Sequence, residues 1–249
     1  MPQKQKEDLI VDGERLDGRG PEEMRDVSME VGTLESADGS AFVEIGNTRV
    51  LAGVEGPTEL HPRHLQEPDR AVLQAKYNMA PFSVDDRMSP KPSRRSKEIS
   101  LVTKRALEPA VRLEEFPETA IKVHVEVLEA DASTRVTGIT AAGLALADAG
   151  IPMKGIVQAC AVGKLEDTMV LDVAGEEDAY GKADIPVATI NGDIDRVTLL
   201  QMDGDITVED VREGLDLAET GNQKLYEQQK KTLKDRVTVG EYETDNGGE

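Results

Sequence analysis

The stretch EADASTRVTGITAAGLALADAG, residues 129–150, has almost no bulky side chain and only one basic residue, Arg135. The segment before it, AIKVHVEVLEAD at 120–131, alternates apolar and polar residues, which predicts a strand. Residues 134–149 predict a helix that Gly150 and Pro152 end. A helix of small residues directly after a strand can pack very closely on a sheet, so this stretch predicts a strand and a tightly packed helix within a mixed α and β fold.

The segments on either side predict a largely antiparallel sheet arrangement covered by helices, which is an α+β layout. Residues 27–56 predict an antiparallel meander and residues 57–94 an irregular connection rich in proline. Further predicted elements are a helix within 99–113, strands at 156–167, 168–175, 183–192 and 197–204, and a long amphipathic helix at 207–236 with Thr207 and Asp210 at its cap. We expect one domain over 1–238 with an N-terminal arm at 1–25, and an acidic disordered tail at 239–249.

The chain carries a formal net charge of −20, and aromatic residues make up only 3% of it. So many carboxylates repel the phosphates of nucleic acid unless salt screens the repulsion. Because Asp and Glu are spread from end to end, we interpret the charge as adaptation to molar intracellular salt, where the Debye length falls to about 3 Å. A halophilic source is therefore expected, and we consider the local basic clusters separately from the net charge.

The single cysteine, Cys160, excludes an internal disulfide and fits a reducing cytoplasm, where we expect the protein to work. The three histidines, His61, His64 and His124, form no zinc-ligand pattern with it. The polar first 20 residues predict no signal peptide, and no stretch predicts a membrane span.

The predicted strand ends and the predicted helix begins at three residues, Ser133, Thr134 and Arg135. A helix N-terminus leaves backbone N–H groups unpaired and carries partial positive charge. Two hydroxyls and a guanidinium add further donors, which together are the parts of a phosphate or oxyanion site. The alternative is a tightly packed helix in which Arg135 has a structural role.

A second candidate is LDVAGEEDAYGKAD, residues 171–184, in which a predicted strand ends before acidic residues 176–178 and Asp184 opens the next strand. Carboxylates at facing ends of adjacent strands can share Mg²⁺ or divide the roles of general acid and metal ligand. In so acidic a chain, a solvated turn is the alternative.

A third candidate is SPKPSRRSKEIS, residues 89–100, the densest basic cluster. A predicted helix starts with three basic residues, Arg94, Arg95 and Lys97. The helix dipole disfavours cations at that end, so binding of an external anion would explain their placement. Paired arginines suit a polyanion backbone. A surface of salt bridges is the alternative. Arg63, in the connection at 57–94, adds another basic residue.

Six segments in the same order resemble the phosphorolytic ribonucleases of the RNase PH type, over roughly residues 8–236. They are DGRG at 17–20, GPTELHPRHLQEPDRAVL at 56–73, PSRRSKEIS at 92–100, EADASTR at 129–135, LALADAGIPM at 144–153 and EEDAYGKADIPVA at 176–188. The resemblance implies an RNase PH-type fold in which two β-α units, each like domain 2 of ribosomal protein S5, pack as one domain. It also implies processive 3′→5′ removal of nucleotides by inorganic phosphate, releasing nucleoside diphosphates, and a reverse reaction that adds heteropolymeric RNA tails.

The resemblance also implies roles for the candidate residues. Ser133, Thr134 and Arg135 match the family's phosphate-binding Gly-Ser-Arg, with serine in place of glycine at 133. Asp178 and Asp184 match its acidic pair around Mg²⁺ or Mn²⁺, with Asp178 as general acid and Asp184 as metal ligand.

The basic residues match family positions too. Arg95 is implied to steer RNA or phosphate and Arg94 to contact the RNA backbone. Arg63 is implied to grip single-stranded RNA at a channel neck.

The partners follow from the resemblance as well: a hexameric ring built as a trimer of heterodimers with an Rrp42-like subunit, and an Rrp4- or Csl4-type RNA-binding cap. The alternatives are a homohexameric RNase PH that trims tRNA 3′ ends, an inactive Rrp42-like scaffold, and a protein-interaction module. The inactive-scaffold alternative is disfavoured because the chain has all four of the residues Arg95, Arg135, Asp178 and Asp184. HPRHL and GKADIPVA favour the exosome form.

Overall fold

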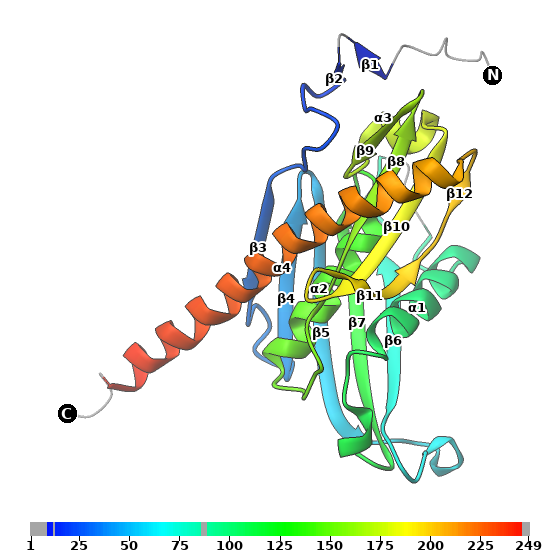
Figure 1. Ribbon diagram of the computed structural model, residues 1–249. Coiled ribbons are helices and arrows are strands. Elements are labelled where there is room, and N and C mark those ends of the chain that lie inside the picture. The colour runs from blue at the N-terminus through cyan, green and yellow to red at the C-terminus, as the bar shows by residue number, and fades with distance from the viewer. Residues whose placement is uncertain (1–8, 12, 86–88, 246–249) are drawn as a thin grey trace.

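The computed structural model describes residues 9–11, 13–85 and 89–245 of the chain. Its elements run in the order β1 (Ile10–Val11), β2 (Glu14–Arg15), β3 (Val27–Val31), β4 (Gly39–Ile45), β5 (Thr48–Glu59), η1 (Arg63–Leu65), β6 (Val72–Met79), α1 (Arg94–Leu107), η2 (Leu113–Glu115), β7 (Thr119–Glu129), α2 (Thr134–Asp148), β8 (Val157–Leu165), β9 (Thr168–Leu171), α3 (Gly175–Tyr180), β10 (Ala183–Ile190), β11 (Asp193–Leu200), β12 (Asp203–Gly204) and α4 (Val208–Asp245) (Figure 1). Among the described helices, none is both long and apolar enough to span a membrane.

The strands form two larger sheets and a small β1–β2 hairpin. The first sheet has the order β3-β4-β5-β7-β6, and the second has the order β11-β10-β8-β9 with β12 paired to β10. All pairs are antiparallel except β6 with β7. The α+β class expected from the sequence is confirmed.

Helix α2, the small-residue helix of the opening stretch, lies between the two sheets. It packs on β4, β5 and β7 of the first sheet and on β8 and β10 of the second, and only three of its 15 residues are not buried. A Cβ atom at Gly143 would collide with the carbonyl oxygen of Val157 in β8. Small residues are therefore required because this helix is covered on all sides, and its approach to β8 is closer than a side chain would permit. One continuous hydrophobic cluster joins both sheets through it.

The outer helices α1 and α4 pack against this core. Helix α4 crosses β8 and β9 of the second sheet, and α1 packs on β6 and α2 (Figure 1). The predicted cap of α4 is confirmed, because the Asp210 amide donates to Thr207 Oγ1 at 3.2 Å and the Thr207 amide donates to Asp210 Oδ2 at 2.7 Å. The helix continues to Asp245 and so enters the segment 239–249 expected to be disordered. A helix already nucleated along a sheet propagates at little cost per residue; residues 246–249 lie outside the described residues.

The expectation of an irregular connection over 57–94 was wrong for part of its length. Strand β5 runs to Glu59, and β6 pairs in parallel with β7. Within β6, Leu73 and Tyr77 are buried while Gln74 and Lys76 are exposed, which is a strand alternation. Prolines on both sides of this short segment hid the pattern, and its partner strand comes only after α1 in the chain.

Candidate active site

A cavity of about 270 Å³ opens where the N-terminus of α1, the N-terminus of α2 and the α3–β10 segment meet. Six of the eight residues predicted from the sequence line it: Arg95, Ser133, Thr134, Arg135, Asp178 and Asp184. The fold therefore brings together residues from three sequence segments that the sequence analysis could treat only as separate candidates.

The start of α2 is built from two residues with left-handed backbone. Ala132 has φ 58° and Ser133 has φ 53°, a region in which glycine is the residue without steric cost. This explains why a glycine suits position 133. The Ser133 hydroxyl donates to the carbonyl oxygen of Val173 at 2.6 Å. The hydroxyl proton is thus directed to the loop before α3, and the Ser133 side chain makes no cap hydrogen bond to the first turn of α2.

Thr134 and Arg135 are held by side chains that the sequence analysis did not single out. The Tyr77 hydroxyl donates to Thr134 Oγ1 at 3.0 Å. Arg135 donates through Nη1 to the side-chain oxygen of Gln201 and through Nη2 to Glu98 Oε2 at 3.4 Å. These three partners belong to β6, α1 and the chain after β11, so no local motif could have identified them.

The two aspartates interact electrostatically across the cavity wall. Asp178 lies on α3, and Asp184 is the second residue of β10. Burial raises the pKa of Asp184 from its ordinary 3.8 to about 6, helped by repulsion from Asp178 and Asp203, while Arg135 and Arg95 act in the opposite direction. Asp203 is the register partner of Asp184 in β12. A carboxyl group of this kind can hold a proton near neutral pH.

Arg95 belongs to the first turn of α1, which contains no acidic residue. The Ser93 hydroxyl caps this helix by accepting from the Ser96 amide at 3.0 Å. In the described part of the chain no ion pair joins Arg95 to a carboxylate. The cavity therefore combines the N-termini of α1 and α2, with the arginines Arg95 and Arg135, and the carboxylates of Asp178 and Asp184.

The comparison with known proteins identifies the family of the chain. Residues 23–152 match the 3′ exoribonuclease family, domain 1, and residues 155–221 match domain 2 of the same family. The chain belongs to the 3′ exoribonuclease (RNase PH) family.

Relatives in this family resemble the chain over almost its whole length. It is 56% identical to the exosome complex component Rrp41 of Thermococcus onnurineus over 233 residues, which are 92% of this chain and 93% of that protein. It is 48% identical to Rrp41 of Archaeoglobus fulgidus over 248 residues, 98% of this chain and 96% of the relative.

Two solved structures share the fold. Rice Rrp46 matches with a TM-score of 0.80 and 26% identity, covering 88% of this chain and 100% of that one. The Archaeoglobus fulgidus exosome with RNA bound to the active site matches with a TM-score of 0.77 and 25% identity, covering 87% and 93%.

Two of the predicted RNA-binding residues of this family member lie outside the cavity. Arg94 precedes Arg95 and is exposed at the start of α1. Arg63 lies in η1, with 80% of its side chain exposed, and pairs with Glu59 at 3.5 Å. The η1 segment is at the opposite end of the molecule from α3 (Figure 1). Contact of RNA with Arg63 or Arg94 remains a prediction.

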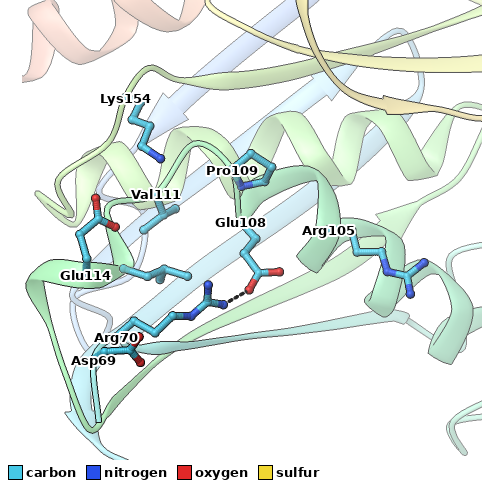
Figure 2. Close-up of a pocket in the computed structure, with 9 residues that line it drawn as sticks. Asp69, Arg70, Arg105, Glu108, Pro109, Val111, Glu114 and Lys154 are labelled. Carbon is cyan, nitrogen blue, oxygen red and sulfur yellow. Dashed lines mark hydrogen bonds and ion pairs between the residues drawn. The ribbon is translucent and has the colours of Figure 1, made fainter. Parts of the chain in front are cut away.

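A wider hollow of about 450 Å³ lies beside the end of α1, away from the candidate site. Figure 2 shows that residues of both charge signs line it, with Arg70 turned toward Glu108 in an ion pair. It contains none of the residues predicted from the sequence. Because the acidic residues Asp69, Glu108 and Glu114 line it together with the basic ones, this hollow lacks the one-sided positive field that a phosphate group requires.

Proposed function

We propose that this chain is the phosphorolytic subunit of an archaeal-type exosome, which degrades single-stranded RNA from the 3′ end and releases nucleoside diphosphates. One observation carries the proposal: a single cavity is lined by two arginines at two helix N-termini and by the pair Asp178 and Asp184. The names of the archaeal relatives support the exosome form of the activity.

The reaction needs charge neutralisation and positioning more than covalent work by the protein. An oxygen of inorganic phosphate forms a bond to the phosphorus of the last phosphodiester, and the bond from that phosphorus to the preceding 3′ oxygen breaks. The products are a nucleoside diphosphate and an RNA shorter by one nucleotide; the reverse reaction extends RNA tails.

Arg135 and the amides of α2 hold the attacking phosphate in this scheme, and Arg95 steers the phosphates into place. Phosphate carries about two negative charges near neutral pH, and it must approach a second phosphate group. Without positive groups on that side of the cavity, this repulsion would suppress the reaction.

The leaving 3′ oxygen takes a proton from the Asp178–Asp184 pair. The resemblance implies Asp178 as the acid and Asp184 as the metal ligand, but the raised pKa of Asp184 supports a proton resting on Asp184 when no cation is bound. We therefore assign the proton to the coupled pair rather than to one member.

A divalent cation fits the same pair. The described residues contain no group of three or more metal-ligating side chains, but Mg²⁺ is commonly bound by one or two carboxylates together with substrate phosphates. The mutual repulsion that raises the pKa of Asp184 is relieved by such an ion. Asp178 and Asp184 would hold Mg²⁺ or Mn²⁺, and the ion would neutralise charge on the phosphates.

We further propose a ring with an Rrp42-like subunit and a cap of the Rrp4 or Csl4 type, working in a cytoplasm of high salt. The relatives named as exosome complex components support the assembly, and the charge of −20 supports the salt.

The test is phosphorolysis of a labelled oligo(A) RNA in molar KCl, with and without an Rrp42-like subunit. Release of ADP only with phosphate and only in the mixed ring supports the proposal. Release without the partner identifies a self-sufficient ring, and no release in any mixture refutes the enzyme assignment.

The site residues are tested in the same assay. Asp178→Ala is expected to abolish ADP release while the affinity for RNA stays nearly unchanged. Asp167→Ala is the matched control, because Asp167 is 92% exposed and pairs only with Lys182. Equal loss of RNA binding and turnover in Asp178→Ala would indicate a folding defect and contradict the role of Asp178.

A further inference from the structure

The DGRG motif at 17–20 belongs to an N-terminal segment that the proposed reaction does not use. In the structure, residues 14–25, here called the arginine arm, lie at the same end of the molecule as α3 and β9 (Figure 1). Three arginines of this arm contact two buried carboxylates, those of Asp172 and Glu177. Charged side chains are rarely buried without a specific arrangement of partners.

Arg15 is the most enclosed member of the arm, with only 3% of the residue exposed. Its Nε donates to Glu177 Oε1 at 2.7 Å and its Nη2 donates to Glu177 Oε2. The remaining N–H groups donate to the carbonyl oxygens of Leu171 at 2.6 Å, Asp172 at 2.7 Å and Glu23 at 3.2 Å. All five donors of the guanidinium are therefore satisfied, four of them by the segment that carries α3.

Glu177 is the residue that fixes α3. This helix has only six residues, too few to be stable without tertiary contacts. The Glu177 carboxylate accepts from the Ala174 amide at 2.9 Å at the start of the helix while it binds the Arg15 fork. Asp178 is the next residue. Its placement over the cavity is therefore set by an ion pair with a residue 162 positions earlier in the chain.

Arg25 connects the acidic side of the cavity to the phosphate side. Its Nε and Nη2 donate to the two oxygens of Asp172, at 2.8 and 2.7 Å. Its Nη1 donates to the carbonyl oxygen of Asp131 at 2.7 Å. Asp131 lies two residues before Ser133, so one guanidinium spans the loop before α3 and the loop before α2.

The two loops that Arg25 joins are both held in left-handed backbone. Asp172 has φ 57°, Ala132 has φ 58° and Ser133 has φ 53°. Such conformations in residues other than glycine persist only when the surroundings fix them. The Ser133 hydroxyl adds a second link between the loops through its bond to Val173.

We infer that Arg15 and Arg25 are positioning residues of the proposed phosphorolysis, which hold the acid-bearing helix α3 at a fixed place relative to the phosphate-binding start of α2. No residue of the arm lines the cavity. The arm acts through Glu177, Asp172 and Asp131. The inference rests on the proposed function, since it assigns a purpose to the geometry of that same site.

The test uses the complete ring and compares kcat with KM. Glu177→Gln keeps the shape of the side chain and removes the charge that Arg15 binds. We expect kcat for ADP release to fall on the order of tenfold to a hundredfold, as for a small displacement of a reacting group. The KM for phosphate and the Kd for RNA should stay within about twofold, because Arg135 and Arg95 do not contact the arm. Arg25→Lys should in addition raise the KM for phosphate, because Arg25 also holds the loop before α2.

Asp148→Asn is the matched control. Asp148 is another buried carboxylate, which pairs with Arg236 and accepts from the Ser40 amide at 2.8 Å, but it lies at the far end of α2. We expect it to lower the unfolding temperature without changing kcat. If Glu177→Gln assembles into rings and keeps kcat within twofold of the wild type, or if Asp148→Asn loses as much kcat, the inference is overturned.

The double variant Arg15→Met/Glu177→Met covers the case in which Glu177→Gln does not fold. It removes both buried charges together, so we expect the unfolding temperature to recover relative to either single change. The inference requires kcat to remain low, since α3 has lost its anchor. Full recovery of kcat would show that the pair only stabilises the fold. A wild-type ring that releases no ADP would instead refute the proposed function.

Discussion

Asp184→Asn is expected to make the protein more stable at pH 7 while it abolishes phosphorolysis. The pKa of Asp184 is raised in the folded protein to about 6, first by burial and then by Asp178. At pH 7 the folded protein must therefore hold an ionised carboxylate in a place that favours the protonated form. Asparagine is neutral and nearly the same size, so it removes this cost.

The magnitude follows from the size of the pKa shift. A rise from 3.8 to about 6 is about two pKa units, and each unit corresponds to about 1.4 kcal/mol. Because part of the side chain contacts solvent and the pair can relax, we expect a gain in the free energy of unfolding of about 2 kcal/mol rather than the full value. For a chain of this length, that gain raises the unfolding temperature by about 4–8 °C.

The sign of the pH dependence is fixed by the direction of the shift. Protonation of Asp184 stabilises the fold, fully so below its unfolded pKa of 3.8, and this contribution is lost as the pH rises through about 6. The advantage of Asp184→Asn over the wild type should therefore be largest at pH 7 and vanish near pH 4.

The assay is thermal unfolding of both proteins between pH 4 and pH 8, with EDTA present so that no cation neutralises the aspartate pair. Asp167→Asn is the control, because a hydrogen bond from Lys182 lowers the pKa of Asp167, the opposite direction to the shift of Asp184; this variant should show no gain in stability at pH 7. A lower unfolding temperature for Asp184→Asn at pH 7, or a gain that does not change with pH, would refute the reasoning.

Three further predictions concern the start and the packing of α2. Arg135→Ala should raise the KM for phosphate at least tenfold and weaken RNA binding less; equal effects, measured by steady-state kinetics and RNA titration, would contradict a phosphate site. Gly143→Ala should lower the free energy of unfolding by about 3 kcal/mol through collision with the β8 backbone. Gly214→Ala in α4 approaches side-chain atoms only, the nearest being the terminal methyl of Met169 at 3.1 Å, and should change the melting temperature little. Ser133→Ala should cost about 1 kcal/mol because the bond to Val173 is lost, and Ser133→Gly should recover it by relieving the left-handed backbone. Similar unfolding temperatures for the two Ser133 variants would be inconsistent with that account.

Much of the fold could be predicted because the relevant signals are local. The alternation of residues 120–131 and the small residues of 134–149 predicted β7 and α2 within two residues of their observed ends. The cap formed by Thr207 and Asp210 was also visible in the sequence. Strand β6 was missed because its pattern is short, lies between prolines and depends on a partner that is distant in the chain.

The candidate site was predicted residue by residue, but only the structure gives its arrangement. Local clusters and the family resemblance identified four residues that line one cavity: Arg95, Arg135, Asp178 and Asp184. The partners of Arg135 were not identifiable, because Gln201 and Glu98 have no local motif.

Local sequence indicates which residues could carry charge and hydrogen-bond donors to a phosphate, since residue type and position relative to a helix end are local properties. The tertiary structure decided which of them meet, and it decided the proton affinity of Asp184, because burial and the distance to Asp178 exist only in the folded chain. It also assigned a place to the DGRG segment, whose neighbouring Arg15 finds Glu177 only after the chain has folded. Long-range pairs of this kind leave no periodic signal in a sequence, because their spacing is set by the fold and not by the chain.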